Sequence, residues 1–184
     1  AYTGIGPYAG LYAILTALSS ILIEFMGVSP TIFGYLFAII MLGNLAASLL
    51  AGRLVAAIGE IPLIYTGCTI CLLSGIVAAS FAWQGVVTPA SIVVPSLGFM
   101  IGFALLIPAA TAGAMSPFPE MAGRSSSIIG LVHYSAGAIT SLLMGLMADG
   151  THFPLVNALI ICGILTFLSI WPIYKTHKNL LSTE

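Results

Sequence analysis

The feature that most constrains this chain is a run of 59 residues, from Ile61 to Pro119, without a charged side chain. Soluble globular proteins are about one quarter charged, whereas 5% of this chain is charged, 60% is hydrophobic and the mean hydropathy is +1.17. Such a chain has too few polar side chains to cover a surface that faces water. It is therefore predicted to be an integral membrane protein whose main partner is the lipid bilayer, and its scarce basic residues argue against binding to nucleic acid.

Six apolar segments are long enough to cross the hydrocarbon core as helices, which takes roughly 20 residues each. These segments are Ile5–Met26, Thr31–Gly52, Ile61–Ala82, Ala90–Met115, Ser125–Ala148 and Pro154–Tyr174. They are continuously apolar, whereas the strands of a membrane barrel alternate in polarity over about ten residues. Helices also satisfy every backbone polar group internally, as lipid requires. The sequence therefore predicts an all-α membrane domain of six transmembrane helices that occupies residues 1–184.

Basic residues predict the orientation of these helices. The chain has four, Arg53, Arg124, Lys175 and Lys178, and they follow the second, fourth and sixth spans. All four then lie on one side of the membrane, and the positive-inside rule makes that side cytoplasmic, together with both termini. The chain has neither an initiator Met nor a signal-peptide pattern before its first span, so we expect it to be a segment of a longer protein.

Two ionisable side chains inside the predicted spans are the first candidates for function, because such groups are costly in lipid. His133 is the ninth residue of the fifth span, about 12 Å from its start and thus near the membrane midplane. An imidazole with an ordinary pKa of about 6.5 can handle a proton near neutral pH. His133 is thus a candidate for substrate or proton handling, and the alternative is a neutral histidine bonded to a neighbouring helix. Glu24, the only acid within a span, lies near the non-cytoplasmic end and either recruits a substrate or cation or simply reaches water.

Other candidates inside the spans have an equally simple packing role. Asn44, near the middle of the second span, could bind substrate, although we favour a hydrogen bond that joins two helices. The aromatic residues Tyr12, Tyr134 and Phe103 are candidates for lining a substrate cavity.

Small residues and one proline suggest how the helices pack or move. Gly130 and Gly137 belong to a stripe of small residues in the fifth span. Such stripes let membrane helices approach closely, and in a transporter they could also be sliding faces. Pro108, inside the fourth span, removes a backbone hydrogen bond and predicts a kink, which would be a gating position in a carrier.

Catalysis and metal binding are not indicated by the sequence. Cys68 and Cys71 form a C-x-x-C pattern inside an apolar span with no further Cys or His nearby, which favours packing over redox chemistry or zinc binding. The single aspartate, Asp149, stands at the end of a span, and no G-x-S-x-G pattern accompanies His133, which disfavours an intramembrane protease. We predict that the chain is not an enzyme and uses no cofactor or metal.

Two short motifs stand at the starts of the second and fifth spans. The first is Ser29-Pro30 followed by Phe33-Gly34 and Phe37, and the second is Pro119-Glu120-Met121-Ala122-Gly123-Arg124-Ser125-Ser126-Ser127 followed by Gly130. Together they resemble the patterns "SP..FG..F" and "P.MAG.ASS..G" of the bicyclomycin- and chloramphenicol-resistance (Bcr/CflA) branch of the major facilitator superfamily. In that branch the two motifs belong to the second half of the carrier.

The resemblance covers essentially the whole chain and implies helices seven to twelve of a twelve-helix carrier, arranged as two inverted three-helix repeats. It implies a secondary active transporter of the bacterial inner membrane that exports drugs and other small amphipathic molecules by proton antiport with alternating access. A six-helix amino-terminal half, absent here, would be the partner that completes the substrate cavity.

Three positions depart from the family pattern. Ala56 stands where the loop after the second span usually has an acid, Arg124 replaces a usual Thr, and Ser125 replaces the commoner Ala. Without the acid this chain offers no charge-relay latch in that loop. The coupling acid of the family usually lies in the first half, so H+ as the coupling ion is implied here by resemblance alone.

Two other functions stay open at this point. A carrier of the same superfamily could move another solute, such as a sugar or an organic acid, although no Arg or Lys lies inside the spans to bind an anion. A stand-alone six-helix membrane subunit would have the same spans. Six further spans encoded in frame upstream would distinguish a carrier from such a subunit.

Overall fold

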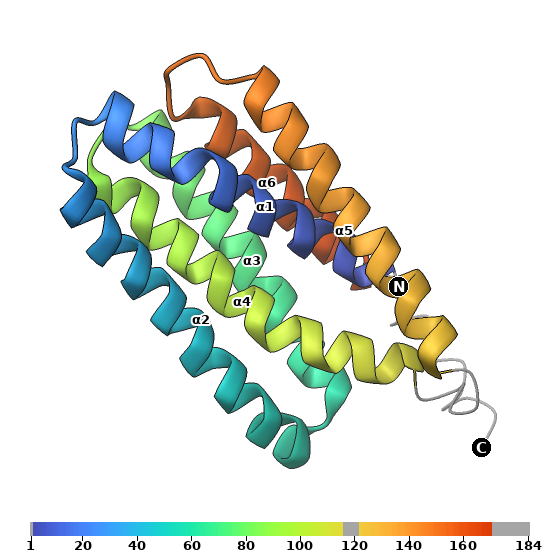
Figure 1. Cartoon of the computed structure of the whole chain (residues 1–184). Helices are drawn as coiled ribbons and strands as arrows, with labels where there is room; N and C mark the ends of the chain where they lie inside the picture. Colours follow the sequence, from blue (N-terminus) through green and yellow to red (C-terminus); the bar gives the residue numbers. More distant parts are fainter. Residues whose placement is uncertain (1, 116–121, 171–184) are drawn as a thin grey trace.

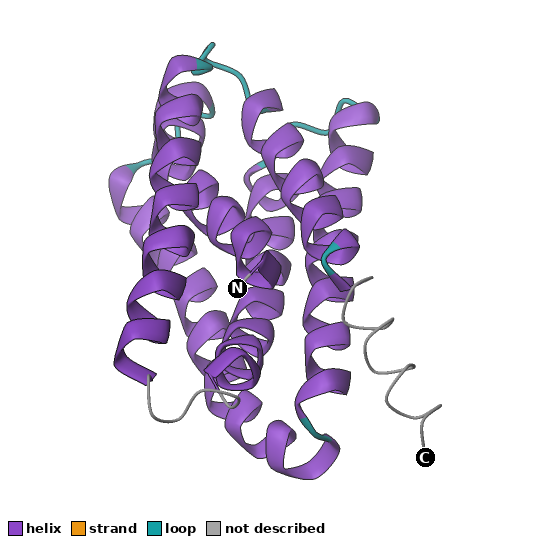
Figure 2. Cartoon of the chain, turned by 90° about the vertical axis from the view of Figure 1, so that its right-hand side faces the viewer, coloured by secondary structure: helices purple, strands orange, loops and turns teal. Residues whose placement is uncertain are grey.

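The chain folds as a bundle of helices. The computed structural model describes residues 2–115 and 122–170, and in this part of the chain the regular structure is helical, without strands (Figure 1, Figure 2). The main helices are α1 (Ile5–Ser19), α2 (Pro30–Ile58), α3 (Glu60–Trp83), α4 (Pro89–Met115), α5 (Ala122–Leu146) and α6 (Phe153–Leu168). A short 3-10 turn, η1 (Tyr2–Gly4), precedes α1, and a π-helical segment, η2 (Ser20–Phe25), continues it. The predicted all-α fold class is confirmed.

Five of the described helical segments are long and apolar enough to cross a membrane, namely α1 with η2, α2, α3, α4 and α5. The sixth helix, α6, has 16 residues, and residues 171–174 of the predicted sixth span lie outside the described residues. The helices otherwise match the predicted spans, with one clear difference at the end of α2.

Helix α2 runs to Ile58, well past its predicted end at Gly52. A glycine inside a helix lowers its stability by only about 1 kcal/mol, so Gly52 does not end it. Gly59 does end it, because its φ of +85° is a conformation that side chains other than glycine adopt at a cost. At the other end of α2, the Ser29 hydroxyl accepts a hydrogen bond from the Ile32 amide at 3.4 Å, and Pro30 occupies the first turn, where its missing N–H costs nothing.

The helices pack in a pattern that repeats itself. Helices α1 and α4 lie in the middle of the bundle, with α2 and α5 on either side of them (Figure 1). Helix α4 packs on α2 and α3, α1 packs on α5 and α6, and α3 packs on α6. Exchanging α1 with α4, α2 with α5 and α3 with α6 converts this set of pairs into itself. Because α1 and α4 run in opposite directions, this is the pattern expected of two inverted three-helix repeats.

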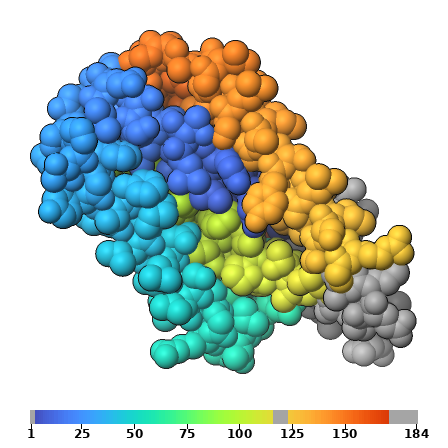
Figure 3. Space-filling model, viewed as in Figure 1, coloured from blue at the N-terminus to red at the C-terminus, as the bar shows by residue number. Residues whose placement is uncertain are grey.

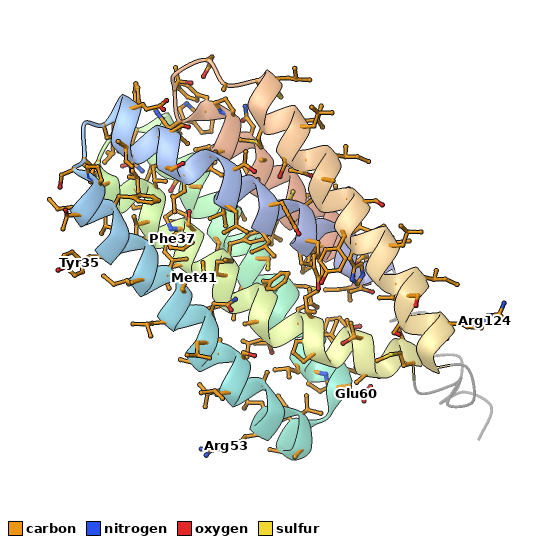
Figure 4. All side chains as sticks on the ribbon, in the orientation of Figure 1. Tyr35, Phe37, Met41, Arg53, Glu60 and Arg124 are labelled. Carbon is orange, nitrogen blue, oxygen red and sulfur yellow. The ribbon has the colours of Figure 1, made fainter. Side chains whose placement is uncertain are left out.

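The two ends of the bundle differ in charge. Arg53, Glu60 and Arg124 lie at one end, here called the charged end (Figure 4). The connections at residues 26–29, 84–88 and 147–152 lie at the other end, here called the loop end. Arg53 and Arg124 thus share one side of the bundle, as the sequence predicts, whereas Lys175 and Lys178 lie outside the described residues.

One face of the bundle combines four helices. In the space-filling view, α1 and α4 are flanked by α2 and α5 on a continuous surface (Figure 3). Helix α4 is the most buried of the spans, whereas α2 and α5 are the least buried. Only Ile40, Ala47 and Ala51 of α2 are fully buried.

Candidate functional site

Three of the six polar and aromatic residues singled out in the sequence, Phe103, His133 and Tyr134, meet around one further residue, Tyr8. The ring of Tyr8, on α1, stacks on the His133 ring of α5, with centroids 4.6 Å apart and planes 24° apart. Tyr8 also contacts Phe103 of α4 edge-on at 5.2 Å and Tyr134 of α5 edge-on at 5.7 Å. We call Tyr8, Phe103, His133 and Tyr134 the aromatic cluster. It joins three helices and contains the titratable residue that the sequence placed at mid-depth.

The two ends of the cluster differ in exposure. His133 is 3% exposed, whereas Tyr134 is 59% exposed. The imidazole also lies directly against the backbone of Gly4, where a Cβ atom would collide with the ring. The cluster therefore holds a buried imidazole against the Tyr8 ring and the Gly4 backbone, and one of its rings, that of Tyr134, reaches the surface of the chain.

Tyr8, at the centre of the cluster, is not among the residues that sequence reasoning selected. A usable signal was present, because Tyr8 and Tyr12 are four residues apart and therefore share one face of α1. Tyr12 itself belongs to the contact between α1 and α5 rather than to the cluster. Its ring lies against Gly137, where a Cβ atom would collide with it.

The same contact continues toward the loop end through a polar pair. The hydroxyl oxygens of Thr16 on α1 and Ser141 on α5 are 2.9 Å apart. Gly137 and Ser141 are four residues apart, so the small-residue stripe of α5 faces α1 in this part of the helix. Gly130 does not share this role, because a Cβ atom there would meet only the ring of Tyr134, in its own helix, at 3.8 Å.

Asn44 joins two helices. Its side-chain amide donates a hydrogen bond to the backbone carbonyl of Met100 at 3.0 Å, which ties α2 to α4. The interhelical bond favoured from the sequence is therefore the one observed, and it uses the amide group that would otherwise be available to a substrate.

Pro108 lies inside α4, which stays helical from Pro89 to Met115. The Thr111 hydroxyl donates to the carbonyl oxygens of Ile107 and Pro108, at 2.8 and 3.0 Å. Helix α4 also contains a second internal proline, Pro95, to which the sequence reasoning gave no role. Each proline removes one backbone hydrogen bond from the helix.

The cysteines have a packing role, as expected from the sequence. Cys68, Cys71 and Cys162 are buried free thiols. The Cys71 sulfur lies 3.7 Å from the carbonyl oxygen of Phe99 on α4, at a point where α3 and α4 approach closely. Among the described residues, no three side chains of the metal-ligating types gather into a possible metal site.

Glu24 lies apart from the aromatic cluster. It follows Tyr8 by sixteen residues on the same helical segment, a distance of about 24 Å along the axis. Its side chain is exposed and borders a cavity at the loop end. The predicted candidates are thus divided among the aromatic cluster, two helix–helix contacts at Tyr12 and Asn44, and a separate acidic position at Glu24.

Comparison with known proteins identifies relatives for this chain. No family model matches it. It is 30% identical over 178 residues to the bicyclomycin resistance protein homolog of Haemophilus influenzae, a match that covers 95% of this chain and 43% of the relative. It is also 30% identical over 139 residues to multidrug resistance protein D of Escherichia coli, covering 75% of this chain and 35% of that protein. The chain therefore spans less than half the length of either relative.

The relatives agree with the motifs and with the fold. The two sequence motifs, the six apolar helices with their repeating pattern of contacts, and the near-complete coverage by a bicyclomycin resistance protein homolog have one explanation. The chain belongs to the bicyclomycin-resistance branch of the major facilitator superfamily, and it corresponds to the carboxy-terminal six-helix half of such a carrier.

Proposed function

We propose that this chain is one half of a secondary active transporter that exports small amphipathic molecules from the bacterial cytoplasm across the inner membrane. The observation that carries the proposal is the match to a bicyclomycin resistance protein homolog over 95% of the chain. The exported compounds would bind between two six-helix halves near the midplane, and each half would rock to expose the cavity to one side at a time.

The aromatic cluster is the proposed contribution of this half to substrate and proton handling. Its rings offer apolar faces on which a flat or amphipathic molecule can stack. His133 adds a group that can change its charge near neutral pH. A substrate and a proton that favour different conformations of the same cluster would exchange across the membrane, because each shifts the conformational equilibrium in the opposite direction. We take H+ to be the coupling ion on this basis.

Helices α2 and α5 supply the proposed surface for the other half. Both are poorly buried in this chain, and both carry helical glycines that contact nothing within 4 Å at the Cβ position, such as Gly34, Gly52 and Gly145. A glycine lowers helix stability by about 1 kcal/mol relative to alanine, and no neighbour in the described chain requires it at these positions. Close packing against a second six-helix unit would provide the reason. The charged end, with Arg53 and Arg124, would face the cytoplasm.

The test of this function replaces His133 in the carrier at its native length. His133→Ala removes both the titratable group and the ring that stacks on Tyr8, whereas His133→Phe keeps the stacking ring and removes only the titration. We expect both variants to reach normal abundance and to lose the pH dependence of drug efflux between about pH 5.5 and pH 8, which brackets the ordinary imidazole pKa.

The pair of variants separates proton handling from packing. If His133→Phe restores wild-type efflux across the whole pH range while His133→Ala does not, the imidazole is a packing residue. If neither variant changes efflux, the aromatic cluster has no part in transport. Abundance is measured by quantitative immunoblot of the membrane fraction, and efflux by loss of a preloaded fluorescent substrate.

A further inference from the structure

A second site lies at the loop end, away from the aromatic cluster. It is a cavity of about 420 Å³ between the α1–η2 segment and the last turns of α5, bordered by the connection to α6. This volume is within the range of roughly 300–1,000 Å³ that small-molecule sites occupy. Thr16, Ser20 and Glu24 form one wall, and Met144, Gly145 and Thr151 contribute to the opposite side.

The π-helical segment explains why one wall is continuous. An α-helix turns about 100° per residue, so positions four apart drift by about 40° around its axis. A π-helical turn holds more residues than an α-helical turn and reverses this drift. The backbone bond from the Met26 amide to the Ile21 carbonyl, five residues back and 3.0 Å away, marks the widened turn. Thr16, Ser20 and Glu24 thereby line the same cavity.

The charges around this cavity are negative. Glu24 is the acidic side chain of its wall, and Asp149 stands in the adjoining connection. The Thr151 hydroxyl and amide donate to the Asp149 carboxylate, and these hydrogen bonds hold the pKa of Asp149 below its usual value. Arg53 and Arg124, the arginines of the described part of the chain, lie at the charged end, on the far side of the bundle (Figure 4). A cation in the cavity therefore meets the Glu24 carboxylate, while neither of these arginines lies at this end. The imidazole of His152 lies behind the lining residue Phe25.

The remaining surface of the cavity is apolar. Ile21, Phe25, Met144 and Pro154 contribute to its lining. The ring of Phe25 also packs against the buried ring of His152, with centroids 6.0 Å apart, which fixes the aromatic side of the site. An aromatic face and a polarisable thioether both suit a large, weakly hydrated cation.

We propose that this cavity binds a lipophilic organic cation, such as a phosphonium or a quaternary ammonium ion, through the Glu24 carboxylate and the surrounding apolar side chains. The site is distinct from the aromatic cluster, and it depends on the proposed function only in that the chain is tested within the complete carrier. Binding rather than efflux is therefore the measurement, so a carrier that binds the cation but does not transport still tests the site.

The first experiment measures equilibrium binding of radiolabelled tetraphenylphosphonium to the purified carrier at its native length. We expect Glu24→Gln to weaken binding at least about tenfold, because a charge-assisted contact is lost, and Glu24→Asp to retain most of it. Glu60→Gln is the matched control, since it neutralises a carboxylate at the charged end (Figure 4), and it should bind like the wild type. Tetraphenylborate, which has the same shape and the opposite charge, should not displace the cation.

The second experiment locates the bound cation and does not depend on the affinity of the Gln variant. Ser20→Cys, which places an exposed thiol on the same wall of the cavity and keeps the Glu24 carboxylate, is labelled with a membrane-impermeant methanethiosulfonate, and tetraphenylphosphonium should slow this reaction. The native thiols Cys68, Cys71 and Cys162 are buried, and labelling of the carrier without the substitution is subtracted, so the difference reports on position 20. Gln84→Cys, in the exposed α3–α4 connection at the same end, is the control and should react at an unchanged rate.

Three results would overturn the proposal. One is an unchanged affinity of Glu24→Gln for tetraphenylphosphonium. Another is equal displacement of the cation by tetraphenylborate, which would indicate apolar partitioning rather than a charged site. The third is equal protection, or no protection, at positions 20 and 84.

Discussion

At the scale of single residues, several polar side chains inside the bundle are held by identifiable partners. Asn44 donates to the Met100 carbonyl, the Thr16 and Ser141 hydroxyls pair with each other, and the ring of His133 stacks on Tyr8. In lipid a polar group without such a partner is expensive, so each of these contacts restrains the rotation of one helix relative to another.

The bond between α2 and α4 gives a prediction at this scale. Asn44→Leu removes the hydrogen bond to Met100, and we expect it to lower the free energy of unfolding by about 0.5–1.5 kcal/mol. Asn157→Leu is the matched control, because Asn157 is exposed on α6, and it should cause no loss. Thermal unfolding of both purified variants in detergent measures the difference. Equal destabilisation by the two substitutions would mean that the interhelical bond contributes nothing specific.

At the scale of helices, close approach depends on glycines at particular crossings. A Cβ atom at Gly75 on α3 would lie 2.8 Å from the Leu159 carbonyl oxygen and 2.9 Å from the Ile160 Cα of α6. At Gly67, a Cβ atom would lie 2.8 Å from the Gly102 carbonyl oxygen of α4. These neighbours are backbone atoms, which cannot rotate away, so α3 approaches both helices only because no side chain intervenes.

The same substitution at two glycines tests this account of helix packing. Gly75→Ala should destabilise the bundle by about 1–3 kcal/mol, because α3 and α6 must move apart. Gly34→Ala should be neutral or stabilising by up to about 1 kcal/mol, since nothing lies within 4 Å of its Cβ position and alanine is the better helix former. Melting temperatures of the two variants, measured side by side on residues 1–184, decide the matter, and equal shifts would refute the proposed close contact.

At the scale of the whole molecule, the four-helix face formed by α1, α2, α4 and α5 (Figure 3) would be the wall of the proposed cavity between two halves. Many large apolar side chains of α2 and α5 are exposed on this chain, among them Leu42 at 62% and Leu142 at 64%. Lipid can cover such side chains. A substrate cavity that is walled on one side only, however, cannot keep the two sides of the membrane separate.

We therefore predict that residues 1–184 alone do not transport. Proteoliposomes that contain only this chain should show no drug movement in response to a pH gradient, whereas the carrier at its native length should show it. Circular dichroism and size-exclusion chromatography of the isolated chain establish that it is folded and whether it self-associates. Gradient-driven transport that rises with the amount of the isolated chain would contradict the prediction.

Sequence alone determined the features that depend on local composition. Long apolar runs predicted the membrane class and the positions of the helices, because crossing lipid is a requirement that each segment meets by itself. The Ser29-Pro30 pair marked the start of α2 for an equally local reason, namely capping, whereas the end of α2 was predicted at Gly52 and lies at Ile58. The motif around Met121–Gly123 predicted the family, and the relatives confirmed it.

Only the tertiary structure decided which side chains meet. The position of Tyr8 at the centre of the aromatic cluster, the partner of Asn44 and the separation of Glu24 from His133 depend on how far each helix is rotated about its axis and shifted along it. The π-helical turn that directs Glu24 into a cavity changes that rotation within a single segment. No individual helix encodes these quantities in its own hydropathy, because they are settled by the steric fit between neighbouring helices.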